Sequence, residues 1–457
     1  MKKSPSRSDK LEEIQRQTFD YFIHEVNNLN GLVADTIEKG APASIAAVGL
    51  ALSAYPVGVE RGFITRSNAI KITLATLRFF RKSSQGTEVD ATGYKGFYYH
   101  FLNMSTGKRA WKCELSTVDT AILLAGMLVA GAYFTGGTPA EREIRSLSED
   151  LYDRADWQWA ANSGLTVAMG WNPENGFLPY RWQGYDEALI LYLLALGAPR
   201  FSLSPESYAA WTSTYNWRKV YDHEFLYSGP LFTHQISHIW TDFRGVQDYY
   251  MRTKSIDYFE NSRRATYAQR QYAIDNPLGF KGYGENCWGI TACLGPGPAT
   301  RKIKGKNCQF FGYVGRGIPD GPDDGTLAPW GVIASLPFAP EIVLPAIDHF
   351  DTLNLRVSNT YGFKSTFNAT FPGGTAKSPY WHSPFHCGLN QGPIVLMIEN
   401  FRSGLLWRLM RQCPPLVRGL HRAGFAGGWL GPCPSNDRDA TPARRDDFQP
   451  LGGASRR

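Results

Sequence analysis

Residues 184–197 read GYDEALILYLLALG, and they join two adjacent acids, Asp186 and Glu187, to an unbroken apolar run. The run repeats apolar residues at helical spacing, which predicts a buried helix that begins beside the acids. Acids are favoured at a helix N-terminus because its N–H groups are unpaired, so both carboxylates can serve as caps alone. Aromatic residues gather in the adjoining loop, as in the floor of a sugar-binding site, and these are Phe177, Tyr180, Trp182 and Tyr185. The stretch therefore leaves a cap and a catalytic acid open as interpretations.

The same helical periodicity recurs along most of the chain. It predicts helices over residues 10–26, 44–55, 65–80, 115–134, 138–160, 205–215, 255–273, 329–337, 340–350 and 391–411. Strand patterns are few and do not alternate with helices, so we expect an all-α fold built from antiparallel helix pairs. Residues 280–327 form a long segment rich in glycine and proline, which is more often functional than idle. We expect such loops to lie over a cleft.

The chain has 457 residues and no linker-like stretch before residue 423. We therefore expect a flexible N-terminus over 1–9, one folded domain over 10–423 and a disordered basic tail over 424–457. The first residues lack the apolar segment of a signal peptide, and no apolar run is long enough to span a membrane. As written, the sequence indicates a cytoplasmic protein, and a periplasmic or secreted location stays open if the start is misassigned. We expect a monomer.

Composition narrows the class of ligand. The formal net charge is +7, but much of the excess lies at the two ends of the chain, which argues against a nucleic-acid partner. Aromatic residues make up 14% of the chain, which suits a cleft that stacks on sugars. The seven cysteines form no CxxC pair and no metal-binding spacing, so we expect free thiols.

Two further pairs are candidates for a site. Glu114 and Asp119 lie five residues apart at a junction between loop and helix, where they can line a cleft or only cap the helix. His234 and His238 are four residues apart and can face one way on a helix, as metal ligands do. Because no third ligand is evident, sugar contacts or core hydrogen bonds are favoured over a metal.

Asp242 and Arg244 can form a structural ion pair or hold a sugar. Glu285 lies beside Gly284 in the long loop, where glycine permits close approach of the backbone to a ligand or simply allows a turn.

A series of short motifs runs in order through the folded part of the chain. The motifs are GFYYHF at 96–101, CELSTVDTA at 113–121, YDEA at 185–188, HQ at 234–235, SH at 237–238, DFRG at 242–245, YGEN at 283–286, WG at 288–289, DGT at 324–326, YGF at 361–363, QGP at 391–393 and IEN at 398–400. Each is short, but their order resembles the glycoamylase-like proteins. These include the endo-β-1,2-glucanases of glycoside hydrolase family 144 and a domain of cyclic β-1,2-glucan synthases.

The resemblance implies a fold, an activity and a site. The fold is an (α/α)6 barrel, a toroid of six helical hairpins, and the activity is hydrolysis of glucans by two carboxyl groups without metal or cofactor. Glu187 is implied as the general acid, and Asp119 is the partner carboxylate that we expect. The other substrate-binding residues expected are Glu114, Tyr185, Asp186, His234, Gln235, His238, Asp242, Arg244, Glu285, Trp288 and Asp324.

The sequence departs from the family at three positions that are usually acidic. Ser365, Leu294 and Asn390 stand where relatives carry Asp. Neither serine nor leucine can replace a catalytic carboxylate at neutral pH, so the identity of the second acid stays open. The remaining candidates are Asp119, Glu114, Asp324 and Asp186.

Three functions are compatible with these residues. The first is a glycoside hydrolase that acts on β-1,2-glucan or sophoro-oligosaccharides. The second is a transglycosylase on the same scaffold, and the third is a carbohydrate-binding protein with impaired catalysis, as the three neutral positions suggest.

Overall fold

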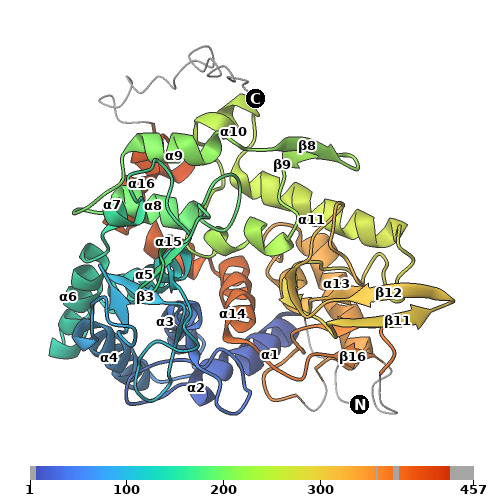
Figure 1. Cartoon of the computed structure of the whole chain (residues 1–457), viewed down its shortest axis with the longest axis horizontal. Coiled ribbons are helices and arrows are strands. Elements are labelled where there is room, and N and C mark those ends of the chain that lie inside the picture. The colour runs from blue at the N-terminus through green and yellow to red at the C-terminus, as the bar shows by residue number, and fades with distance from the viewer. Residues whose placement is uncertain (1–6, 357–358, 374–379, 433–457) are drawn as a thin grey trace, which may run out of the picture.

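The computed structural model describes residues 7–356, 359–373 and 380–432. Helices dominate, and they surround a central region onto which the long loops converge (Figure 1). The most deeply buried helices are α3 (Ile45–Glu60), α5 (Thr117–Tyr133), α8 (Leu189–Gly197), α12 (Pro329–Ile333) and α14 (Gly388–Arg402). They are apolar on nearly every side, which is typical of helices enclosed by other helices.

The buried helices pack against one another. α3 lies between α5 and α14, while α5 also contacts α8, and α14 also contacts α12. At the crossing of α3 and α5, a side chain on Gly49 would meet the Ile122 carbonyl at 2.4 Å, and one on Gly126 would meet the Gly49 carbonyl at 2.0 Å. Glycine at these two positions therefore permits the close approach of the two helices.

Amphipathic helices cover the buried ones. α1 (Arg7–Phe19) packs on α14, α4 (Arg66–Lys82) and α6 (Pro139–Asp153) pack on α3 and α5, α13 (Pro340–Thr352) packs on α12, and α16 (Pro414–Arg422) packs on α8. The remaining helices are α2 (Tyr21–His24), α7 (Trp157–Ala160), α9 (Pro205–Thr212), α10 (Tyr249–Thr253), α11 (Tyr258–Asp275), α15 (Leu405–Met410) and the short 3-10 helices η1 (Leu231–His234), η2 (Ile236–Ile239) and η3 (Gly428–Leu430).

Short strands connect the helices and make the fold less purely helical than predicted. Among the described residues there are six small sheets, of which the largest has the order β2-β3-β5-β6-β7. The strands are β1 (Ala43–Ser44), β2 (Gly93–Tyr94), β3 (Phe97–Tyr99), β4 (Phe101–Leu102), β5 (Leu115–Ser116), β6 (Gly170–Asn172), β7 (Gly176–Phe177), β8 (Trp217–Val220), β9 (His223–Leu226), β10 (Ala292–Leu294), β11 (Ala299–Ile303), β12 (Lys306–Phe310), β13 (Tyr313–Gly315), β14 (Thr326–Leu327), β15 (Phe367–Asn368) and β16 (Trp381–His382).

Several predicted boundaries are wrong, among them the division of 10–26 into α1 and α2 and of 138–160 into α6 and α7, and three others have a clear physical reason. α3 continues through Pro56, because packing on all sides of this buried helix outweighs the hydrogen bond that proline removes. The last long helix is divided at Gly404, whose φ of 68° is left-handed. The expected disordered tail includes Phe425, which is fully buried, and Ala426, which pairs with Gln247.

The rest of that tail, 433–457, and residues 1–6 of the predicted N-terminal segment lie outside the described residues. Residues 7–9 of that segment belong to α1. None of the helices that the described residues form is long and apolar enough to cross a membrane.

Candidate active site

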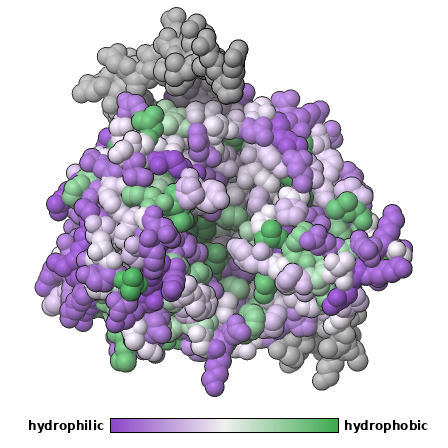
Figure 2. Space-filling model, viewed as in Figure 1, coloured by the Kyte–Doolittle hydropathy of each residue, from purple (hydrophilic) through white to green (hydrophobic). Residues whose placement is uncertain are grey.

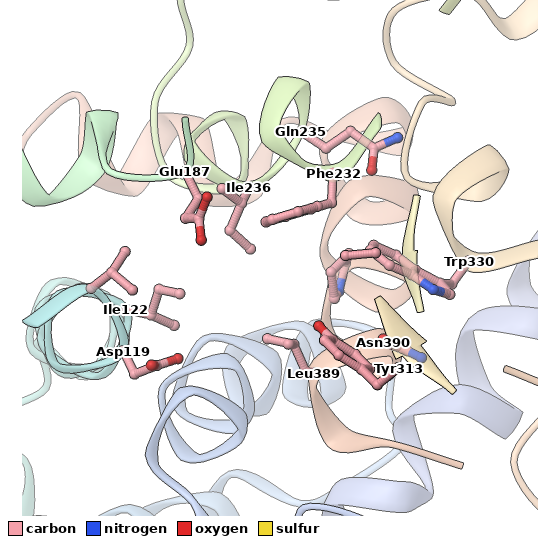
Figure 3. A pocket seen from close by; sticks show the side chains of 13 residues that line it. Asp119, Ile122, Glu187, Phe232, Gln235, Ile236, Tyr313, Trp330, Leu389 and Asn390 are labelled. Atoms are coloured by element: carbon pink, nitrogen blue, oxygen red, sulfur yellow. The ribbon is translucent and has the colours of Figure 1, made fainter. Parts of the chain in front are cut away.

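A pocket opens at the centre of the molecule, where the buried helices meet the long loops. Figure 2 shows a hollow on this face, with hydrophobic residues in its depth and hydrophilic residues around it. The pocket is lined by Val118, Asp119, Ile122, Glu187, Phe232, Gln235, Ile236, Ala292, Tyr313, Trp330, Leu389, Asn390 and Pro393. Its two acids, Asp119 and Glu187, point into the same space from neighbouring elements (Figure 3).

Glu187 lies in the turn immediately before α8. The N-cap of that helix is Ala188, and Ser237 Oγ accepts a hydrogen bond from the Ile190 N–H at 3.1 Å. Glu187 is therefore not a helix cap, and it faces the pocket. Burial raises the pKa of Glu187 to about 8, and the charges of Asp186 and Asp119 add to the rise, against a hydrogen bond from backbone.

Asp186 points away from the pocket, although it is the neighbour of Glu187. Its Oδ1 accepts hydrogen bonds from the Ala188 N–H at 2.9 Å and from Trp211 Nε1–H at 3.2 Å. Burial raises the pKa of Asp186 to about 7 despite these two hydrogen bonds. Asp186, predicted to bind substrate, is therefore not among the residues that line the pocket.

Asp119 is positioned by the N-terminus of α5. Ser116 is the N-cap of this helix, and its hydroxyl accepts a hydrogen bond from the Asp119 N–H at 3.3 Å while donating one to Asp119 Oδ2 at 2.5 Å. The side chain that caps α5 is therefore that of Ser116, while the Asp119 carboxylate lines the pocket, which favours the cleft interpretation over the cap for Asp119.

His100 is a site residue that sequence reasoning missed. The pairing of β3 with β5 brings it beside Glu114, where its Nδ1 lies 2.9 Å from Glu114 Oε1, and its Nε2 lies 3.6 Å from Asp119 Oδ2. Burial alone would lower the pKa of His100, but Asp119, Glu114 and Asp35 raise it to about 9. The imidazole is thus a cation among three carboxyl groups at neutral pH.

The pKa values of Asp35 and Glu114, two of the carboxyl groups around His100, respond to the same charges. Burial raises the pKa of Asp35 to about 6, against the attraction of His100, and Asp119 adds to the rise. Burial would also raise the pKa of Glu114, but the hydrogen bond and the charge of His100 bring it below its usual value. His100 occurs in the GFYYHF motif at 96–101, so the sequence contained a signal for it. Asp35 lies in none of the quoted motifs, so the sequence contained no signal for that residue.

The aromatic walls of the pocket also differ from the prediction. They are formed by Phe232, Tyr313 and Trp330, whereas Tyr185 is buried against Tyr215 and Tyr258, and Trp182 is buried with its Nε1–H donated to Thr117 Oγ1. Tyr313 stands in the hollow with 69% of its surface exposed. It belongs to β13, within the long segment that we expected over the cleft.

A buried ion pair fixes the loop that carries Tyr313. Arg316 donates to Asp324 Oδ1 at 2.8 Å and Oδ2 at 2.7 Å, and both side chains are fully buried. The same guanidinium donates to the Phe311 and Gly312 carbonyls just before β13, and to the Cys293 carbonyl on β10. Asp324, predicted to bind substrate, therefore has a structural role in holding the loop.

The structure does not bring His234 and His238 to the pocket, and that expectation is wrong. Both are buried in the core, where His234 Nε2 lies 3.1 Å from the Ser228 carbonyl and His238 Nε2 lies 2.9 Å from Ser262 Oγ. Burial lowers the pKa of His234 to about 4 and that of His238 to about 3. The reason is that η1 and η2 turn these rings toward aromatic neighbours. Between them, Gln235 does line the pocket, as predicted.

Other predicted binding residues also have structural surroundings. Asp242 is buried and paired with both Arg244 and Arg411, which favours the structural ion pair over the sugar contact. Trp288 is fully buried in the core, and Glu285 is exposed and paired with Arg270. None of these residues lines the pocket, because the loops that carry them fold over the core.

The three departures from the expected acids gather around Tyr313. Asn390 lines the pocket, and Leu294 is the cross-strand neighbour of Tyr313 in the β10–β13 pair. Ser365 is buried next to Thr366, whose hydroxyl donates to the Leu294 carbonyl at 2.7 Å. Within the described residues that line the pocket, Asp119 and Glu187 are thus the acids that remain.

Comparisons with known proteins identify the family of the chain. The family model Glycoamylase, described as "Putative glucoamylase", matches residues 179–414. A Bacteroides uniformis structure of the same description is 31% identical, with a TM-score of 0.82, and the match covers 94% of this chain and 100% of that one. The Chitinophaga pinensis endo-β-1,2-glucanase, solved with sophorotriose and glucose, is 25% identical with a TM-score of 0.81, covering 93% of this chain and 100% of that one.

A curated relative is the exo β-1,2-glucooligosaccharide sophorohydrolase (non-reducing end) of Parabacteroides distasonis. It is 27% identical over 447 residues, which cover 90% of this chain and 57% of that protein's length. The chain thus spans little more than half the length of this relative. Because the family model matches more than half of the chain, and a solved relative matches nearly all of it, the chain belongs to the Glycoamylase family.

Proposed function

We propose that this protein is a glycoside hydrolase that acts on β-1,2-glucan or sophoro-oligosaccharides. The observation that carries the proposal is the pair of carboxyl groups in one pocket, Glu187 with its pKa raised to about 8 and Asp119 beside the His100 cation. Glycosidic cleavage needs one protonated carboxylic acid and one carboxylate. The substrate class is supported by the β-1,2-glucan enzymes among the relatives.

Each residue has a role in this proposal. Glu187 donates its proton to the glycosidic oxygen, so that the bond between that oxygen and the anomeric carbon breaks. Asp119 either removes a proton from the water that attacks the anomeric carbon or attacks that carbon itself. Phe232, Tyr313 and Trp330 supply ring faces for the sugar units.

We also propose that the helix pairs form an (α/α)6 toroid and that the protein acts as a monomer. The contacts between α3, α5, α8, α12 and α14, each covered by an outer helix, support the toroid. Proteolysis that releases a second stable domain from residues 10–423 would contradict this arrangement.

The test is incubation of the purified protein with β-1,2-glucan, sophoro-oligosaccharides and glucans of other linkages. We expect new reducing ends from the β-1,2-linked substrates alone. Redistributed linkages without a net gain of reducing ends would assign a transglycosylase instead. Cleavage restricted to another linkage would overturn the proposed substrate.

A second candidate is a carbohydrate-binding protein with impaired catalysis. It is favoured by the neutral side chains of Leu294, Ser365 and Asn390 around Tyr313. This alternative predicts that β-1,2-glucan is bound and recovered intact after prolonged incubation, which the same assay measures.

A further inference from the structure

The loop between β4 and β5 exposes a tryptophan to solvent. Trp111 is 70% exposed, and both it and the following Lys112 have a φ of 53°. This left-handed conformation is unfavourable for residues with a side chain, and two in succession are unusual. A single exposed aromatic residue needs no explanation by itself, but one held on unfavourable backbone points to a role that outweighs the cost.

The loop is fixed in this shape by a buried arginine. Arg109 Nε donates to the Cys113 carbonyl at 2.6 Å, and one of its terminal nitrogens donates to the Lys112 carbonyl at 2.7 Å. The guanidinium is also paired with Glu174 and lies over the Tyr99 ring, with its central carbon 4.7 Å from the centroid. Trp111 is therefore presented by a rigid support, which lowers the entropy lost when a ligand binds.

A series of rings connects Trp111 with the pocket. The Trp111 ring lies 5.2 Å from Phe101, and Phe101 is stacked on His100 at 4.0 Å with an angle of 11°. His100 is in turn 3.6 Å from Asp119, which lines the pocket. The His100 side chain is partly buried, whereas Trp111 at the outer end of the series is 70% exposed.

We propose that Trp111 is a sugar-binding platform outside the pocket, on which a glucose unit of a longer glucan chain stacks. The inference rests on the proposed function for the identity of the ligand. Pyranose rings carry C–H groups on one face, and an exposed indole provides an apolar surface of matching size with a polar edge. Trp111 would thus favour long chains over short oligosaccharides that fill the pocket alone.

Binding tests this platform without relying on catalysis. We would run the wild type, Trp111→Ala and Trp111→Phe by native electrophoresis in gels with and without soluble β-1,2-glucan. The matched control is Tyr249→Ala on α10, because Tyr249 is 61% exposed but lies outside the ring series. We expect the glucan to retard the wild type, with the affinity of Trp111→Ala about two- to tenfold weaker. Trp111→Phe should lose less affinity for the glucan, and Tyr249→Ala should bind it as tightly as the wild type does.

Hydrolysis separates this inference from the proposed function. The ratio of kcat/KM for polymeric glucan to that for sophorotriose should fall about two- to tenfold in Trp111→Ala. An unchanged affinity and ratio in this variant, or equal losses in Tyr249→Ala, would overturn the platform while leaving the hydrolase in place. A wild type that binds the glucan through Trp111 but cleaves nothing would overturn the proposed hydrolase and keep the platform. A wild type that the glucan does not retard in the gel would overturn the platform.

Discussion

Nε2 of His100 lies 3.6 Å from Oδ2 of Asp119, one of the two acids that line the pocket. Nδ1 of the same ring lies 2.9 Å from Glu114 Oε1. The cation gives Asp119 a countercharge, whereas burial raises the pKa of Glu187 in the same pocket to about 8. Two acids in environments that differ in this way can divide the roles of proton donor and carboxylate.

His100→Gln removes this countercharge. The pKa of His100 rises from 6.5 to about 9 on folding, so the cation stabilises the fold fully below pH 6.5, and this contribution disappears as the pH rises through 9. The rise corresponds to at most roughly 3 kcal/mol. We therefore expect the variant to have a lower Tm than the wild type at pH 6 and a much smaller difference at pH 9.5, together with reduced turnover.

Thermal unfolding at the two pH values checks this, with His349→Gln on α13 as the control for loss of a histidine. A Tm difference that does not change with pH would show that the His100 ring acts through packing alone.

Glu187→Gln removes the proposed proton donor while keeping the size of the side chain. We expect turnover on β-1,2-glucan to fall about 10²- to 10⁴-fold. In the wild type, kcat/KM should decline as the pH rises above 8, since the acid must be protonated. Asp186→Asn, which retains the Oδ1 acceptor, should lower turnover by less, and equal losses in the two variants would contradict the assignment.

Glu187→Gln should also be more stable than the wild type at neutral to basic pH. Because burial raises the pKa of Glu187 from 4.5 to about 8, its stabilising effect is complete below pH 4.5 and is lost as the pH rises through 8. The Tm of Glu187→Gln should therefore exceed that of the wild type more at pH 8 than at pH 5. A larger gain at pH 5 would show that the carboxyl is not held protonated in the fold.

Arg316→Met breaks the buried ion pair that holds the Tyr313 loop. Removing one partner leaves Asp324 charged and unpaired, so we expect a loss of about 3–5 kcal/mol in the free energy of unfolding. Arg78→Met is the matched control, because Arg78 pairs with Glu143 at the surface and should cost less than about 1 kcal/mol. Urea denaturation measures both, and similar losses would show that Asp324 is satisfied without Arg316.

Tyr313→Ala and Tyr313→Phe separate the ring from the hydroxyl. If Tyr313 is a stacking surface, the alanine variant should raise KM for sophoro-oligosaccharides about tenfold, while the phenylalanine variant stays close to the wild type. Equal effects in the two variants would assign the contribution to the hydroxyl. Steady-state kinetics on one oligosaccharide of fixed length distinguish these results.

The amino-acid sequence was sufficient to predict the buried helices and the elements that carry the two acids. Apolar residues on every side of the predicted helices over 44–55 and 115–134, and of the run after Glu187, require enclosure by other helices, and the order of the short motifs identified the family. The position of Glu187 before α8 and of Asp119 in the first turn of α5 also followed from local pattern, because helix starts have a recognisable sequence.

Which polar and aromatic side chains face the pocket depends on how distant segments pack together. His100 meets Asp119 because β3 pairs with β5, and Tyr313 enters the hollow because Arg316 and Asp324 close its loop. His238 carries the same imidazole as His100, and Trp288 is aromatic like Tyr313, but both are enclosed by the core. An imidazole or indole suits a core and a sugar site equally well, so its role depends on contacts between segments distant in sequence, which local periodicity does not encode.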